Sequence, residues 1–151
     1  MDKEKSGKLI VTDAEGKIAG RLASRVAKFL LSGSRVIVLN SEKALISGNK
    51  KSILNEQRLS LEIGSIINPK HGPIHPRKPD RILSRMVRGM LPRTKTKGID
   101  AYKRLRVYIG VPSEYSSQAR QEIEDAKPKR AKAYYTEVGW VAQEIGWKGT
   151  D

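Results

Sequence analysis

Apolar and polar residues along the first 40 positions follow a pattern that predicts a strand, a helix and a second strand. A short apolar run at Lys8–Thr12 is typical of a buried strand. Between residues 20 and 33, apolar side chains recur at helical spacing. This apolar face consists of Leu22, Val26, Phe29 and Leu30. Arg35–Asn40 is β-branched and almost wholly apolar, as in a strand covered on both faces. The three elements together predict a βαβ unit with parallel strands.

The remaining hydrophobic pattern predicts further elements. Residues 44–48 favour a short strand, and residues 52–63 favour a helix with less regular spacing. Residues 104–110 alternate between apolar and polar side chains, which predicts a strand with one polar face. Residues 112–127 begin with a proline and a serine and favour an amphipathic helix, and residues 136–147 predict a short last helix capped by Thr136.

This element order indicates an α/β protein of about one domain, since 151 residues are enough to bury a core without disulfides or a metal. We expect an α/β core over residues 1–111 and a helical C-terminal extension over residues 112–151. From Ile109 onward six bases face seven acids, so the extension differs in charge from the core. We therefore expect it to pack on the core or on a neighbouring protein, within a single domain overall.

Charge is concentrated in one stretch of the chain. The formal net charge is +14, and the 41 residues Asn68–Tyr108 hold 12 Lys and Arg against Asp80 and Asp100, a local charge of +10. Four prolines between residues 69 and 79 predict a stiff, extended entry to this stretch. So many bases with so few acids repel one another unless a polyanion is bound, which favours nucleic-acid contact.

A basic helix face strengthens this interpretation. Residues 80–89 predict a helix in which Arg81, Arg85 and Arg88 lie on one face, a regular array suited to phosphates. A second helix repeats the spacing with Arg21, Arg25 and Lys28. The competing interpretation is that such stripes are ordinary solvated helix faces, and the shortage of acids argues against it.

The sequence gives little support for a catalytic site or a cofactor-binding site. GKIAGRLAS lies between a strand and a helix but matches neither common phosphate-loop pattern, and Asn40 stands where a ribose-binding acid would be. Cysteine is absent, and the intervening glycine and prolines keep His71 and His75 off one helix face, so we expect no metal site. Asp80 is expected to cap the N-terminus of its helix and Asp100 to do similar work near the next helix, so neither is expected in an acid–base pair.

Other residues leave alternatives open. Trp140 and Trp147 are expected to anchor the tail, whereas Tyr134 and Tyr135, beside the basic segment KPKRAK, could either pack or stack on bases. An RNA-processing enzyme and a free nucleic-acid-binding regulator remain as rival hypotheses. The polar start of the chain and the lack of long apolar windows predict a cytoplasmic protein without a membrane span.

Four segments resemble the universal large-subunit ribosomal protein L13 family in its archaeal and eukaryotic branch. They are VTDAEGKIAGRLAS, VIVLNSEKALISGNK, HGPIHPRKPDRI and VRGMLPRTKTKGIDAYKRLRVYIG, in family order over residues 8–111. RGMLP followed by RLRVY is the most specific of these features. The tail from Pro112 matches less distinctly, although its expected last helix, ending near Gly146, is similar to that of archaeal members.

The resemblance implies a three-layer α/β/α fold with a small, mainly parallel sheet, which we take to have four strands. It implies a structural protein, without catalysis or cofactor, that binds large-subunit ribosomal RNA beside neighbouring ribosomal proteins and helps to assemble the subunit. Together with the basic pattern, it predicts RNA contacts at Arg21, Arg25, Lys70, His71, His75, Arg77, Lys78, Arg81, Arg85, Arg88, Arg93, Lys95 and Lys97. Binding is expected to follow backbone and shape more than base identity.

Overall fold

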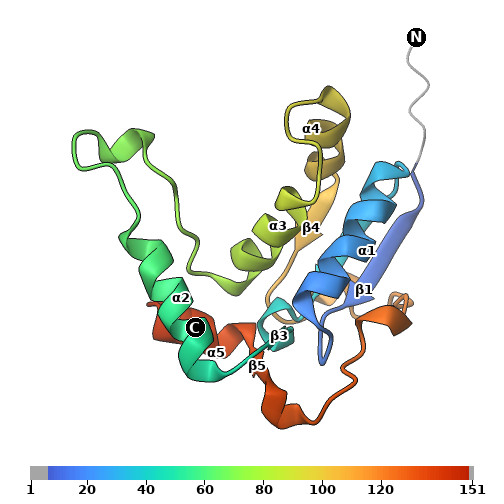
Figure 1. Cartoon of the computed structure of the whole chain (residues 1–151). Coiled ribbons are helices and arrows are strands. Elements are labelled where there is room, and N and C mark those ends of the chain that lie inside the picture. Colours follow the sequence, from blue (N-terminus) through green and yellow to red (C-terminus); the bar gives the residue numbers. More distant parts are fainter. Residues whose placement is uncertain (1–6, 150–151) are drawn as a thin grey trace.

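A parallel three-stranded sheet organises the computed structural model, which describes residues 7–149. Strands β1 (Leu9–Asp13), β2 (Arg35–Leu39) and β4 (Leu105–Val107) lie in the order β1-β2-β4. Figure 1 labels the two outer strands, β1 and β4. Helix α1 (Ala19–Leu31) connects the first two strands, which pair in parallel. The predicted βαβ unit and the α/β class are therefore confirmed.

The described chain contains four further α-helices. They are α2 (Lys50–Glu62), α3 (Pro79–Gly89), α4 (Thr96–Lys103) and α5 (Val138–Glu144). α1 packs against α3, α4 and β2, and α3 also contacts β4 and α5. None of the helices in residues 7–149 is both long and apolar enough to cross a membrane.

The helices cover one face of the sheet. Ile10, Val36 and Leu105 are paired across the three strands and contribute to the main core on this face. α1 supplies the largest helical contribution to that core through an almost fully buried apolar stripe. The buried residues of this stripe are Ala19, Leu22, Ala23, Val26, Ala27 and Leu30. The small alanines allow the backbone of α1 to approach its neighbours closely.

The other face of the sheet is covered differently. Val11, Ile37 and Leu39 form a small second cluster with Tyr108 and Tyr115. The layer on this side therefore consists of tyrosine side chains rather than of the helix layer expected in a three-layer fold. The two rings are tilted against each other, with centroids 5.6 Å apart.

The expected sheet of four strands is wrong in its count. The fourth predicted strand exists as β3 (Leu45–Ser47), but it pairs antiparallel with β5 (Tyr135–Glu137) in a separate two-stranded sheet. β3 turns away because Asn40 adopts a left-handed conformation with φ 53° directly after β2. The chain then passes through a short 3-10 turn at Ser41–Lys43 before β3 begins.

One part of the molecule projects from this body. α2 and residues 63–78 extend away from the sheet, shown in green in Figure 1. α2 buries only Ile53, although it packs on α5. Residues 63–78 then return to α3 with no buried side chain of their own.

The helix predicted for residues 112–127 is wrong. The structure has only short 3-10 turns there, at Ser113–Tyr115 and Glu124–Ala126, joined by extended chain. Part of this segment lies along the outer edge of β1, where Gln121 N donates to Val11 O, in the middle of the strand, at 2.7 Å. A helix would be too short to carry the chain from one face of the sheet to the other.

The last helix is also shifted from its predicted start. Thr136 was expected to cap it, but Thr136 lies inside β5 with 1% of its surface exposed. α5 begins two residues later, at Val138, and its N-cap is Glu137. Pairing with β3 extends the backbone of Thr136, and Val138 N donates to Ala44 O at 2.8 Å.

Candidate nucleic-acid interface

Helix α3 presents the predicted arginine array. Its apolar residues Pro79, Ile82, Leu83 and Val87 are buried against the core, which fixes the rotation of the helix. Arg81 is exposed, and Arg85 and Arg88 are half-buried on the remaining surface. Pro79 occupies the first helical turn, where its missing N–H costs nothing. The array is therefore held by the packing of the opposite face.

The two aspartates of the basic stretch differ from what was expected. Asp80 does lie in the first turn of α3, but it makes no capping bond to the N-terminus, and its Oδ1 is buried without a hydrogen-bond partner in the described chain. Asp100 is not near a helix start. It lies one turn into α4 and accepts from Lys103 Nζ at 3.3 Å.

The proline-rich segment before α3 is folded back on itself. His75 Nε2 contacts Ile63 O at 2.8 Å, which ties the returning chain to the end of α2. Gly72 lies against Ser65, whose backbone N would be 3.3 Å from a Cβ at this position. His75 therefore holds the segment in shape, whereas Lys70 and His71 are exposed near its tip.

The tip itself is apolar. Ile66 and Ile67 have 99% and 97% of their surface exposed. The bases follow the tip on one side only, along the returning chain, at Lys70, Arg77 and Lys78. The tip of the segment is thus apolar, whereas the part of the segment that joins α3 is positively charged.

Arg77 and Lys78 lie where the segment joins α3. Lys78 is exposed at the N-cap position of the helix. The Arg77 guanidinium rests against Gly146 of the tail, where a Cβ would come within 2.9 Å of Arg77 Nη1. Gly146 also has φ +110°, a conformation that favours glycine. The tail therefore supports one of the predicted RNA contacts.

The three bases after α3 lie on a tightly packed turn. Arg93, Lys95 and Lys97 are all exposed between Leu91 and the second turn of α4. Gly98 holds this turn, because a Cβ there would be only 2.1 Å from Pro92 O. The close packing of this turn therefore fixes the backbone that carries the three basic side chains.

The basic spacing on α1 does not reproduce that of α3. Arg21 and Lys28 are exposed, but Arg25 forms an ion pair with Asp125. Asp125 lies in the 3-10 turn Glu124–Ala126, which packs against α1. The charge of Arg25 is therefore already balanced inside the protein.

Ion pairs divide the bases of the chain into two groups. Among residues 7–149, the paired bases are Arg25, Lys43, Arg58, Lys103, Arg120 and Lys127. Of the 12 bases in Asn68–Tyr108, only Lys103 belongs to this group. Arg104 and Arg106 donate to backbone carbonyls, so they help to hold the structure. The remaining bases of the stretch have no carboxylate partner in the described chain.

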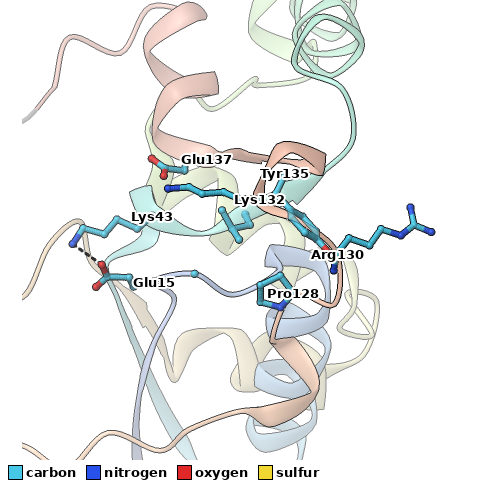
Figure 2. Close-up of a pocket in the computed structure, with 9 residues that line it drawn as sticks. Glu15, Lys43, Pro128, Arg130, Lys132, Tyr135 and Glu137 are labelled. Atoms are coloured by element: carbon cyan, nitrogen blue, oxygen red, sulfur yellow. Dashed lines mark hydrogen bonds and ion pairs between the residues drawn. The ribbon is translucent and has the colours of Figure 1, made fainter.

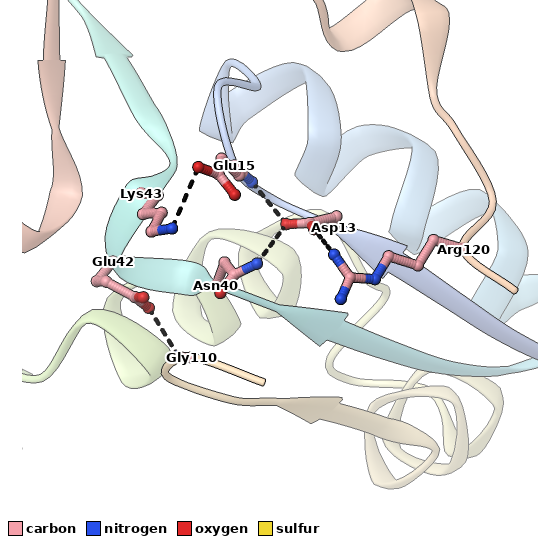
Figure 3. Close-up of polar contacts among 7 residues, drawn as sticks. All are labelled: Asp13, Glu15, Asn40, Glu42, Lys43, Gly110 and Arg120. Carbon is pink, nitrogen blue, oxygen red and sulfur yellow. Dashed lines mark hydrogen bonds and ion pairs between the residues drawn. The ribbon is translucent and has the colours of Figure 1, made fainter. Parts of the chain in front are cut away.

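The carboxyl ends of the parallel strands are closed by a polar network (Figure 3). Asp13 accepts from Glu15 N at 3.0 Å and from Asn40 Nδ2 at 2.9 Å, and it also pairs with Arg120. Burial raises the pKa of the Asp13 carboxyl, but these bonds outweigh it and the pKa is lowered. α/β proteins often bind ligands at this edge of the sheet, and here the protein's own groups occupy it.

Arg120 is one residue of the network that the sequence did not single out. It lies in the segment predicted to be helical, 107 positions from Asp13, and no spacing pattern connects the two. Nearby, Glu42 makes a separate bond by accepting from Gly110 N at 3.1 Å (Figure 3). The network therefore joins the tail to the sheet.

A hollow of about 340 Å³ lies between the two sheets and the tail, lined by residues of both charges (Figure 2). Lys43 Nζ is 3.1 Å from Glu15 Oε1, and Lys132 lies near Glu137. Within residues 7–149, no group of three or more His, Cys, Asp or Glu side chains is placed to hold a metal ion.

A surface of clustered bases without carboxylate partners is the electrostatic footprint by which nucleic-acid-binding proteins are recognised. Comparison with known sequences agrees with this class and makes it specific. Residues 7–114 match the family described as Ribosomal protein L13. The chain belongs to this family of large-subunit ribosomal proteins, whose members are structural, so it has no enzymatic role.

Relatives in archaea match nearly the whole chain. The protein is 44% identical to large ribosomal subunit protein uL13 of Aeropyrum pernix, over 93% of this chain and 91% of that protein. It is 46% identical to uL13 of Methanosarcina barkeri, over 93% and 99% of the two chains. It is 37% identical to uL13 of Saccharolobus solfataricus, over 99% and 100%. The tail is thus included in the similarity.

Proposed function

We propose that this large-subunit ribosomal protein binds large-subunit ribosomal RNA through α3 and the segments on either side of it. One observation carries the proposal: only one of the 12 bases of Asn68–Tyr108, Lys103, has a carboxylate partner, whereas five of the 16 bases elsewhere in the described chain have one. Unpaired guanidinium groups on a packed helix can meet several phosphates with little loss of side-chain entropy. The protein thereby helps to hold the folded RNA during subunit assembly.

The contact surface has three parts. Arg81, Arg85 and Arg88 form its centre. The returning segment adds Lys70, His71, Arg77 and Lys78, with His75 holding its shape, and the turn before α4 adds Arg93, Lys95 and Lys97. Arg21 extends the surface onto α1, and Arg25 contributes only if RNA displaces Asp125. These contacts are directed at phosphates and at RNA shape.

A triple substitution tests the centre of this surface. Arg81, Arg85 and Arg88 changed together to Ala should weaken binding to a large-subunit RNA fragment about a hundredfold near 0.1 M salt, because three phosphate contacts are lost. The fold should survive, since these side chains have no carboxylate partner among the described residues. Filter binding measures the affinity, and circular dichroism checks the fold.

The matched control removes three other positive charges. Lys43, Arg58 and Lys127 are all ion-paired within the protein, so changing them together to Ala alters the net charge equally. This variant should retain most of its RNA affinity. Equal losses in the two triple variants would show that net charge, rather than the α3 surface, drives binding, and the proposal would fail.

Association with the subunit tests the partners and location. We propose that the protein resides in cytoplasmic ribosomes, in contact with ribosomal RNA and with neighbouring large-subunit proteins. In a gradient of cell lysate it should migrate with the large subunit at moderate salt and dissociate at high salt. Migration as a free protein under both conditions would instead favour a regulator that acts away from the ribosome.

A further inference from the structure

A second basic surface lies beside the start of α2, on the opposite end of this helix from the projecting segment. It is a hollow of about 510 Å³ lined by Lys50, Lys51, Arg130 and Tyr134, with no acidic residue in its wall. None of these residues belongs to the surface around α3. The hollow joins two distant parts of the chain, the link from β3 to α2 and the tail segment before β5.

The backbone holds the two walls of this hollow together. β3 and β5 pair antiparallel, with Ser47 opposite Tyr135. The pairing continues one step further, where Gly48 N donates to Tyr134 O at 3.0 Å. Arg130 N donates to the hydroxyl of the buried Tyr135 at 3.3 Å, which holds the segment from the other side. Strand pairing therefore places Tyr134, and the bond to the Tyr135 hydroxyl places the backbone of Arg130.

Tyr134 is exposed, whereas the next residue, Tyr135, is buried. Tyr135 has 8% of its surface exposed and packs inward, whereas Tyr134 has 58% exposed. The Arg130 guanidinium lies 6.0 Å from the centroid of the Tyr134 ring. The guanidinium lies over one face of the ring, and the exposed remainder of the ring is suited to stacking with a flat, electron-rich base.

The charges of this hollow are available to a ligand. Within the described chain, neither Lys51 nor Arg130 forms an ion pair, and Lys50 lies 5.2 Å from the centroid of the Trp140 ring. The adjacent hollow is different, because Glu15 and Glu137 there lie among its lysines. Figure 2 shows Arg130 pointing away from those carboxylates.

We propose that this hollow binds an unpaired nucleotide of RNA, with the base stacked on Tyr134 and the phosphates beside Arg130 and Lys51. The inference rests on the proposed RNA-binding function and adds a second site of different chemistry. The surface around α3 carries arginines directed at phosphates, so it accepts duplex RNA. A duplex keeps its bases stacked inside, so it cannot use the Tyr134 ring.

The test compares two probes on the full chain. One is a single-stranded oligoadenylate, and the other is a blunt RNA duplex with the same number of phosphates. Tyr134→Ala should weaken single-strand binding about tenfold, as loss of one stacked base does, and leave duplex binding unchanged. Tyr134→Phe keeps the ring and should bind both probes like the parent, and thermal unfolding verifies that each variant is folded.

Ultraviolet crosslinking gives a direct measurement. Oligoadenylate should crosslink at Tyr134, located by mass spectrometry, and Arg130→Ala with Lys51→Ala should reduce the yield. Equal single-strand affinity for Tyr134→Ala and the parent would overturn the proposal. So would an acidic peptide of the same charge that binds with the same dependence on Tyr134.

The two RNA sites can fail separately. If the α3 triple variant loses duplex binding while Tyr134→Ala has no effect on either probe, only the second site is wrong. If Tyr134→Ala loses single-strand binding while the α3 triple variant binds both probes like the parent, the surface around α3 is wrong and the second site stands.

Discussion

Arg25 and Arg85 carry the same charge on helices that pack against each other, yet their surroundings differ. Arg25 is paired with Asp125, while Arg85 lies beside Gln57 and Ser60 in a groove between α2 and α3 that has no acidic lining. Spacing along a helix places both side chains on a surface. Which of them keeps a free charge depends on a residue 100 positions away.

Asp13 provides a prediction about stability and pH. Asp13→Asn should lower the free energy of unfolding by about 1–3 kcal/mol at pH 7, because it removes a largely buried, charge-assisted acceptor. The pKa of Asp13 is lowered in the folded protein, so its charged form stabilises the fold at pH values above the unfolded pKa of about 3.9. That stabilisation is lost as pH falls through the folded pKa. Urea unfolding at several pH values between 7 and 3 should show the difference between parent and variant narrowing toward low pH.

Glu15→Gln supplies the control. Its ion pair with Lys43 is exposed, and exposed pairs contribute about 0–1 kcal/mol. A difference between parent and Asp13→Asn that stays constant over the same pH range would contradict the proposed role of the Asp13 charge.

Among the elements, those with one uniform environment were predictable. α1 and α3 each bury a single face, and β1 and β2 are buried on both faces along nearly their whole length, so the apolar pattern was sufficient to locate them. Residues 112–127 failed because Tyr115 and Ile123 share helical spacing but pack in different clusters, one on each side of the sheet. Eight residues span about 12 Å as a helix and about 26 Å when extended, and crossing the sheet edge requires the extended form.

Ile123 tests this account of the tail. Ile123→Ala should lower the free energy of unfolding by about 2–5 kcal/mol, since the side chain is 5% exposed in the main core. Ile66→Ala is the matched control at a position that is 99% exposed, and it should change stability by less than about 0.5 kcal/mol. Chemical unfolding measures both. If Ile123→Ala changed the free energy of unfolding as little as Ile66→Ala, the tail would not be held by packing against the core.

In the molecule as a whole, two things determine where positive charge is left without a partner: the clustering of bases along the sequence and the ion pairs formed in the fold. The tail supplies most of the carboxylates that pair with bases of the body and tail, namely Glu122, Glu124, Asp125 and Glu144. The surface around α3 receives almost none of them. Of the formal net charge of +14, +10 belongs to Asn68–Tyr108.

Salt dependence provides the prediction at this level. The slope of log K against log salt for a large-subunit RNA fragment should become shallower by about 2–3 in the Arg81, Arg85 and Arg88 triple variant, since each lost phosphate contact removes about 0.7–0.9. The control triple at Lys43, Arg58 and Lys127 should keep the slope of the parent. Titrations at several salt concentrations measure it. Parallel slopes for parent and α3 variant would mean that these arginines do not contact phosphates.

Local sequence was enough to identify the βαβ unit, the basic stretch and the arginine face of α3, because helical and strand periodicity and net charge are properties of neighbouring residues. It did not indicate the separate β3–β5 sheet, the extended tail, or the Asp13–Arg120 pair. Nor did it choose between packing and exposure for Tyr134 and Tyr135. Those features arise from contacts between segments about 90 or more positions apart, such as Gly48 with Tyr134 and Arg25 with Asp125, and such contacts leave no periodic signal in the chain.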